Sequence, residues 1–135
     1  MSARTLSRAE IESANDIRTE IVSVPEWGGD VAVRQLTGAE RDAFEAGLVR
    51  TTPEGKREPD LSNMSAKLVA ACMVDGITGD RLFSDTEVER LAAKSATALR
   101  RVFEAAQRLN GMGAAAVETV EKNSVAAPSG SSTSV

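Results

Sequence analysis

The residues of this chain that could carry out chemistry are few, and the first candidates are three aspartates set near glycines. Asp75, Asp80 and Asp85 are spaced somewhat like the acidic ligands of a calcium-binding loop. Counting from Asp75, however, places Ile77 where an oxygen ligand is required and Thr86 where the closing glutamate belongs. The spacing therefore argues against a calcium site, and no other set of residues in the sequence suggests a metal.

Two glycine-containing stretches match parts of nucleotide-binding motifs. Residues 111–116 have the spacing of a dinucleotide-binding turn, but they follow a predicted helix, whereas that turn follows a strand. Gly55 and Lys56 are similar to the end of a phosphate-binding loop, yet Arg50 replaces the first glycine and Arg57 the serine or threonine. We therefore expect no nucleotide cofactor.

Side chains for nucleophilic catalysis are also missing. The chain contains no histidine, which removes the commonest general base and the imidazole metal ligands. Cys72 is the only cysteine, and its neighbours Ala71 and Met73 indicate a buried thiol rather than a reactive one. We expect no catalytic residues and no cofactor, so the protein is predicted not to be an enzyme.

The charge balance bears on the partners of the chain. In 135 residues, 16 Lys and Arg stand against 20 Asp and Glu, which gives a net charge of −4 and no overall positive field for nucleic acid. Neither a secretory signal nor a membrane-spanning run is apparent. We therefore expect a soluble cytoplasmic protein that binds neither nucleic acid nor membrane.

The pattern of apolar residues, capping residues and turns along the chain predicts an α+β fold that is mainly α. A small N-terminal β-hairpin is expected to pack on a bundle of about four helices, followed by a disordered C-terminal tail. The predicted organisation is an N-terminal helical segment over 1–16, a folded domain over 17–113 and a flexible tail or linker over 114–135. Within the domain we predict the hairpin at 17–36 and helices at about 38–50, 62–74, 85–94 and 96–110.

Local signals support these boundaries. Capping boxes begin at Ser7, Thr37 and Ser84, each with a glutamate three residues later. The stretch 51–60 contains Pro53, Gly55 and Pro59 among charges, which predicts an exposed loop. Ser95 favours two separate helices over 85–94 and 96–110. Residues 114–122 have some helix propensity, whereas 123–135 carry no charge and are expected to be disordered.

Two features are candidates for binding a partner. Trp27 lies in the predicted turn, where a tryptophan either folds back as a lid over the aliphatic core or is displayed as a binding anchor. The last helix carries an apolar stripe that either binds a target helix or belongs to the core. Its members are Leu99, Val102, Phe103 and Ala106. Arg100, Arg101 and Arg108 on the same helix are interpreted as a solvated face, since no aromatic residue interleaves them.

Four short motifs in order give the chain a family resemblance. They are PEWGG at 25–29, LTGAERD at 36–42, LFSD at 82–85 and AQRLNG at 106–111. In combination, within one short acidic chain, they resemble the tail assembly chaperones of siphophages that infect high-GC bacteria. The resemblance spans roughly residues 10–122.

The resemblance implies a protein that binds the tape measure protein, keeps that long helical chain soluble and helps to recruit tail tube subunits. Recruitment of the tail tube protein would fall to a longer form made by ribosomal frameshifting, and this chain would be the short form. The resemblance places it in the host bacterial cytoplasm and not in the mature virion. Whether it forms a homo-oligomer is left open.

Two other functions are compatible with the residues alone. One is a different phage structural protein, such as a head–tail completion factor, which would also be small and acidic. The other is a small helical DNA-binding regulator that uses 85–94 and 96–110 as a helix-turn-helix, with Arg100 and Arg101 on phosphates.

Overall fold

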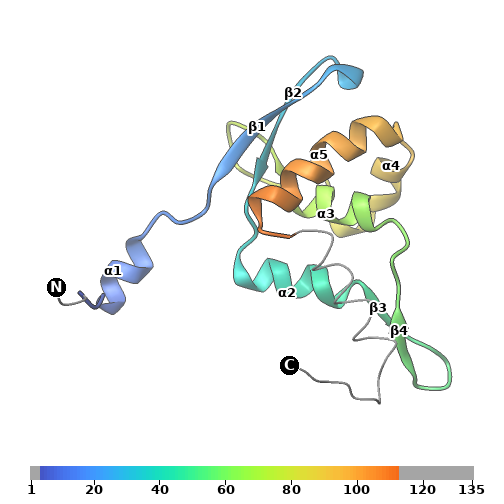
Figure 1. Cartoon of the computed structure of the whole chain (residues 1–135), viewed down its shortest axis with the longest axis horizontal. Coiled ribbons are helices and arrows are strands. Elements are labelled where there is room, and N and C mark those ends of the chain that lie inside the picture. Colours follow the sequence, from blue (N-terminus) through green and yellow to red (C-terminus); the bar gives the residue numbers. More distant parts are fainter. Residues whose placement is uncertain (1–3, 113–135) are drawn as a thin grey trace.

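A computed structural model describes residues 4–112 of the chain (Figure 1). The helices are α1 (Arg8–Ser13), α2 (Gly38–Ala46), α3 (Met64–Cys72), α4 (Val88–Ala92) and α5 (Ala96–Leu109), with short 3-10 turns η1 (Pro25–Trp27) and η2 (Asp85–Glu87). The strands are β1 (Thr19–Val24), β2 (Gly29–Arg34), β3 (Val49–Thr51), β4 (Arg57–Pro59) and β5 (Met73–Val74). The predicted α+β fold, mainly α, is confirmed, while the predicted tail over 114–135 lies outside the described residues.

The main sheet has the strand order β1-β2-β5 and is antiparallel throughout. Its first two strands are the predicted hairpin, with Val22 opposite Val31 across the pair. The third strand comes from residues assigned to the helix at 62–74, and that part of the prediction is wrong. The helix ends at Cys72, and Met73 and Val74 pair with Val33 and Ala32 instead. The pairing supplies backbone hydrogen bonds that a further helical turn would have supplied locally.

Helix α5 forms the centre of the molecule. It packs on the hairpin strands β1 and β2 on one side and against α3 on another (Figure 1). The core joins apolar side chains from these elements and from α4, and the largest that are fully buried include Leu68, Leu91, Val24, Val33, Val69 and Val102. Aliphatic residues fill it because the chain has few aromatic ones.

Helix α2 ends earlier than predicted. It stops at Ala46, where the amide of Gly47 donates to the carbonyl of Ala43, and the next residue, Leu48, is buried. Beyond it, β3 and β4 pair as a second small hairpin, so the stretch expected to be a plain loop contains strands. A helix extended to residue 50 would give up this pairing, in which Val49 lies opposite Pro59.

The two final helices are separate, as predicted. The hydroxyl of Ser95 accepts a hydrogen bond from the amide of Ala98 at 3.3 Å and starts α5. The segment predicted as a helix over 85–94 begins as the 3-10 turn η2 and becomes α-helical only from Val88. At the start of η2 the amide of Ser84 donates to the carboxylate of Glu87 at 2.9 Å.

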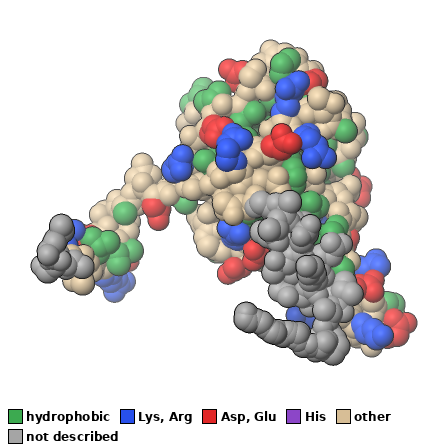
Figure 2. Space-filling view, in the orientation of Figure 1, with side chains coloured by type: hydrophobic (Ala, Val, Ile, Leu, Met, Phe, Trp, Pro, Cys, Tyr) green, Lys and Arg blue, Asp and Glu red, His purple; other side chains and the backbone are tan. Residues whose placement is uncertain are grey.

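Helix α1 stands apart from the rest of the described chain, at the end of an extended segment (Figures 1 and 2). The Ser7 capping box forms, with both the Ser7 side chain and the Glu10 side chain bonded to backbone amides. None of the six residues of α1 is buried, and both Leu6 and Ile11 are exposed. Among residues 4–112, no helix is long and apolar enough to cross a bilayer.

Candidate partner-binding surfaces

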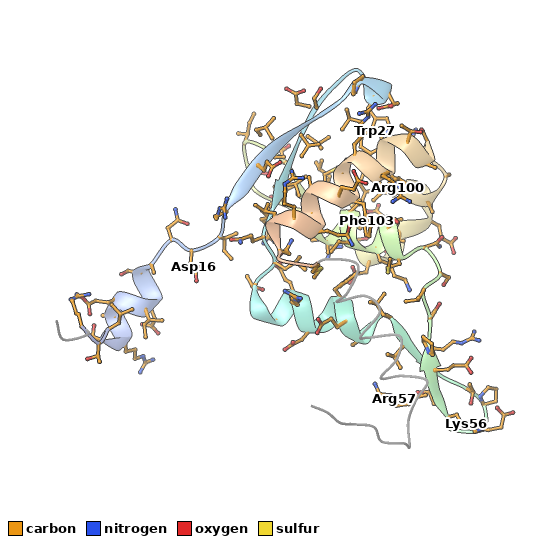
Figure 3. The ribbon with its side chains drawn as sticks, viewed as in Figure 1. Asp16, Trp27, Lys56, Arg57, Arg100 and Phe103 are labelled. Carbon is orange, nitrogen blue, oxygen red and sulfur yellow. The ribbon has the colours of Figure 1, made fainter. Side chains whose placement is uncertain are left out.

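The turn between β1 and β2 presents Trp27 above α5 (Figure 3). Pro25 starts the 3-10 turn η1, and Gly28 ends it with a left-handed φ of 78°, which glycine adopts without strain. Trp27 is half-buried and packs against the hydrophobic core. The tryptophan therefore covers the core as a lid while part of its ring stays open to solvent. Its use as a binding anchor stays a prediction.

An ion pair fixes this turn to α5. The Arg101 guanidinium donates from Nε to both carboxylate oxygens of Glu26, at 2.9 and 3.1 Å, and from Nη2 to Oε2 at 3.0 Å. The bidentate geometry sets the orientation of both side chains. The same guanidinium holds the pKa of the Glu26 carboxyl below its usual range.

Replacing Arg101 with alanine is expected to loosen the Trp27 turn without unfolding the protein. The pair is exposed, so its contribution to global stability is small, but it holds the turn against α5 in addition to the packing of Trp27 on the core. Hydrogen exchange at Glu26–Gly28 should become faster, with exchange in α5 unchanged. Arg100→Ala on the same helix is the matched control and should leave the turn as it was. Equal exchange in the two variants would contradict the restraint.

The apolar stripe of α5 faces inward. Leu99, Val102, Phe103 and Ala106 are all buried among the core side chains. The four residues therefore lie together in the core beneath the β1–β2 hairpin, where they are shielded from solvent. Trp27 packs on the same core (Figure 3). Their packing role is established by this burial, and their binding role stays a prediction.

Sequence reasoning missed the role of two arginines of α5. Besides the Arg101–Glu26 pair, Arg108 Nη2 lies 2.5 Å from Glu20 Oε2 on β1. Two of the three arginines interpreted as a solvated face therefore tie the helix to the hairpin, and their charge is balanced within the fold. Only the acidic residues of the hairpin could have signalled this, and they lie 75 and 88 positions away in sequence.

A groove lies between α2, α3 and the start of α4, with a volume of about 510 Å³. Its apolar lining comes from Ala43, Phe44, Ala71 and Val88, and the side chains of Phe44 and Ala71 are half-buried against the core. The polar residues at the groove are Glu40, Ser62, Asn63, Lys67, Arg81, Asp85, Thr86 and Glu89. Neither the groove nor its residues were predicted, because three separate segments form it.

Two of the charged residues at the groove, Glu40 and Arg81, are held in ion pairs. Arg34 holds Glu40 through bonds of 2.9 and 2.7 Å, and this guanidinium, with help from the Thr37 amide, lowers the pKa of Glu40 to about 2. Arg81 Nη2 lies 2.8 Å from Asp85 Oδ1. These two ion pairs balance charges beside the apolar part of the groove.

Large apolar side chains are also exposed away from the groove. The most exposed is Ile77, at 95%, on the turn after β5. Asp75 builds this turn by accepting hydrogen bonds from the amides of Ile77 and Thr78 at 2.8 and 2.9 Å, which explains an aspartate there without a metal. Ile21 on the edge strand β1 is 63% exposed. These side chains add to the surface that a partner protein could cover.

Cys72 lies inside the fold and bonds to Asn110. Burial raises the pKa of its thiol to about 12, and the Asn110 amide lies 3.5 Å from the sulfur. Asn110 Oδ1 also accepts from the Leu36 amide at 2.8 Å, which joins the end of α5 to the start of α2. Within residues 4–112, no three His, Cys, Asp or Glu side chains cluster as metal ligands would.

The described residues form a small α+β fold whose surface carries exposed apolar side chains and an open groove. A family model described as phage tail assembly chaperone matches residues 5–123. The match covers most of the chain, so the chain belongs to the phage tail assembly chaperone family. Membership of this family indicates a role in phage tail assembly, as a chaperone rather than as a catalyst. It also confirms the resemblance to tail assembly chaperones that the sequence motifs show.

A solved structure supports the fold of this family. The chain is similar to the bacteriophage HK97 tail assembly chaperone, with a TM-score of 0.52 and 18% identity, over 78% of this chain and 94% of that chain. At this identity the likeness establishes the shared fold and nothing finer. No curated protein matches the chain.

Proposed function

We propose that this chaperone binds the tape measure protein while the tail is assembled and keeps that chain soluble. The observation that carries the proposal is the family match over residues 5–123. The tape measure protein is expected to be long and rich in amphipathic helices, whose apolar stripes must be covered before the tail tube encloses them. Many copies of a small acidic chaperone would provide that cover.

The surface of the chain supports such a role. Exposed apolar side chains, among them Leu6, Ile11 and Ile77, provide contacts for apolar stripes. The half-buried ring of Trp27 supplies an aromatic anchor at the tip of the hairpin, held in place by the Arg101–Glu26 pair. We place the first contact with a target helix at this turn, with Leu99, Val102, Phe103 and Ala106 supporting it from below.

Tail tube recruitment belongs to the same proposal. A longer form made by frameshifting would add a domain that binds the tail tube protein, while the short form covers the tape measure protein. Both forms would act in the host cytoplasm and be absent from the mature virion. Mass spectrometry of purified virions should then find the tape measure protein without this chain. Finding this chain there would favour the head–tail completion role instead.

Trp27→Ala is expected to weaken copurification of the tape measure protein with the full-length chaperone. Loss of an aromatic hot spot typically costs at least about 2 kcal/mol, which corresponds to roughly a 30-fold weaker affinity. Co-expression followed by a pull-down measures the amount of tape measure protein that copurifies, and circular dichroism checks that the variant is folded. Lys56→Ala, in the β3–β4 hairpin at the opposite end of the molecule, is the control (Figure 3). Unchanged copurification by a folded Trp27→Ala chain would show that the proposed surface is wrong.

A further inference from the structure

Strand β1 is an edge strand, and over residues 4–112 one of its two sides has no partner. The sheet order is β1-β2-β5, so β1 pairs only with β2 in the described part of the chain (Figure 1). Its six residues run without a bulge, since the register with β2 is continuous. They include no proline, lysine or arginine, which are the residues that commonly protect a sheet edge from further pairing.

The hydrogen bonding of the hairpin shows which backbone groups point to this free side. The Gln35 amide donates to the Arg18 carbonyl at 2.8 Å, so residues 18 and 35 form a hydrogen-bonded pair. Such pairs alternate along an antiparallel ladder, so every second residue of β1 also bonds to β2. These residues are Glu20, Val22 and Val24. The amides and carbonyls of the other three residues point away from β2. They are Thr19, Ile21 and Ser23.

The side chains of these three residues are neutral and exposed. Thr19, Ile21 and Ser23 share the outer face of β1, and Ile21 is 63% exposed. The one charged side chain of the strand, Glu20, belongs to the other face and is paired with Arg108 at 2.5 Å. A row of outward peptide groups beside an exposed isoleucine, with no unbalanced charge, fits another uncharged strand.

The β1 strand of a second copy is such a strand. When two β1 strands pair antiparallel around Ile21, each Ile21 lies opposite its own copy, and Thr19 lies opposite Ser23 of the second copy. The outward groups of these residues then meet in hydrogen-bonded pairs. On the other face, Glu20 lies opposite Val22, so the two carboxylates are not placed directly opposite each other. The edge is therefore complementary to itself, as a two-fold symmetric interface requires.

The helix that covers the inner face of the hairpin is compatible with this pairing. Helix α5 packs on both β1 and β2, so it covers a width of about two strands. Neighbouring strands lie about 4.8 Å apart. The α5 helices of two paired copies would therefore lie roughly 10 Å apart, which is a distance at which helices pack side by side.

We propose that β1 pairs antiparallel with β1 of a second copy of this chain, with Ile21 at the two-fold axis. The pairing joins the two three-stranded sheets into one continuous sheet and places the two Ile21 side chains against each other. It is an interface between copies of the chaperone, so it does not depend on which tail protein the chaperone binds.

Sedimentation equilibrium and amide hydrogen exchange on the full-length chain test the pairing. We expect a dimer that dissociates on dilution. The amides of Thr19, Ile21 and Ser23 should be protected at high concentration and should exchange at least about tenfold faster on dilution. The amides of Glu20 and Val22 bond to β2 within one chain, so their protection should not change.

Two sets of variants test the residues and the register. Ile21→Lys places like charges opposite each other and should weaken association at least about tenfold, whereas Ile77→Lys adds the same charge to a turn outside the edge and should not. Thr19→Lys with Ser23→Glu brings opposite charges face to face and should keep the dimer. Thr19→Lys with Ser23→Lys brings like charges together and should disrupt it. Circular dichroism checks that all four variants are folded.

Three results would overturn the proposal. The first is a natural chain that stays monomeric up to about 100 μM. The second is association that Ile21→Lys leaves unchanged, or that Ile77→Lys weakens to the same degree. The third is equal association of the two double variants, which would exclude the register. A monomeric chain that still copurifies the tape measure protein would refute the pairing and leave the proposed function intact.

Discussion

Replacing Phe103 with alanine is expected to lower the free energy of unfolding by about 3–5 kcal/mol. The ring is 7% exposed and lies in the core that α5 shares with the hairpin and α3. A domain of this size is stable by only about 5–15 kcal/mol, so the variant approaches the limit of folding. Urea denaturation followed by circular dichroism measures the loss.

Two variants make the Phe103 result interpretable. Phe103→Leu keeps most of the volume and should cost much less. Ile77→Ala removes a side chain that is 95% exposed and should change stability by no more than about 0.5 kcal/mol. If Phe103→Ala were as stable as Ile77→Ala, the ring would not be a core residue. A weaker pull-down by Phe103→Ala therefore identifies a binding residue only under conditions where the variant is folded.

Glu40→Gln is expected to remove one contribution to the acid sensitivity of the protein, that of the Arg34–Glu40 pair. The Arg34 guanidinium is the main reason that the pKa of Glu40 falls from 4.5 to about 2. Because the pKa of the carboxyl is lower in the folded state, its stabilisation is complete above pH 4.5 and is lost as the pH falls towards 2. This difference in pKa corresponds to at most about 3.4 kcal/mol, and partial exposure of the pair reduces that to roughly 1–2 kcal/mol.

The measurement is urea denaturation at a series of pH values between 7 and 2. At neutral pH the Glu40→Gln variant should be less stable than the natural chain, and the two curves should converge at the acidic end. Glu89→Gln makes the same charge change at an exposed position of α4 and serves as the control. Curves for Glu40→Gln and the natural chain that stay parallel down to pH 2 would exclude Glu40 as the titrating group.

The candidate surfaces were only partly accessible to sequence reasoning. Trp27 and the α5 stripe were found because each has a local pattern, a tryptophan in a turn and apolar residues at helical spacing. Their burial state could not be read from the pattern, since core and binding stripes look alike in sequence. The pairing of Arg101 with Glu26 needs two segments that are brought together only by the fold.

The sequence by itself determined the features that depend on residues within one helical turn. The boxes at Ser7 and Thr37 form as predicted, and Ser95 separates α4 from α5, because a side chain and an amide three residues away meet in any chain that enters a helix. It also determined an aliphatic core and a lone cysteine, which are matters of composition.

Only the tertiary structure decided where helices yield to strands and which faces are covered. Met73 and Val74 are apolar and follow a helical pattern, yet β2 offers them backbone partners, so they form β5. Val49–Thr51 likewise leaves the helical pattern of α2 for Arg57–Pro59. In both places a strand outside the helix supplies the hydrogen-bonding partner, a distant one (β2) for β5 and the neighbouring hairpin strand (β4) for β3. Each pairing outweighs a local helix preference that amounts to only a few tenths of a kcal/mol per residue, roughly. The same assembly of distant segments created the groove and paired the arginines of α5 with the hairpin.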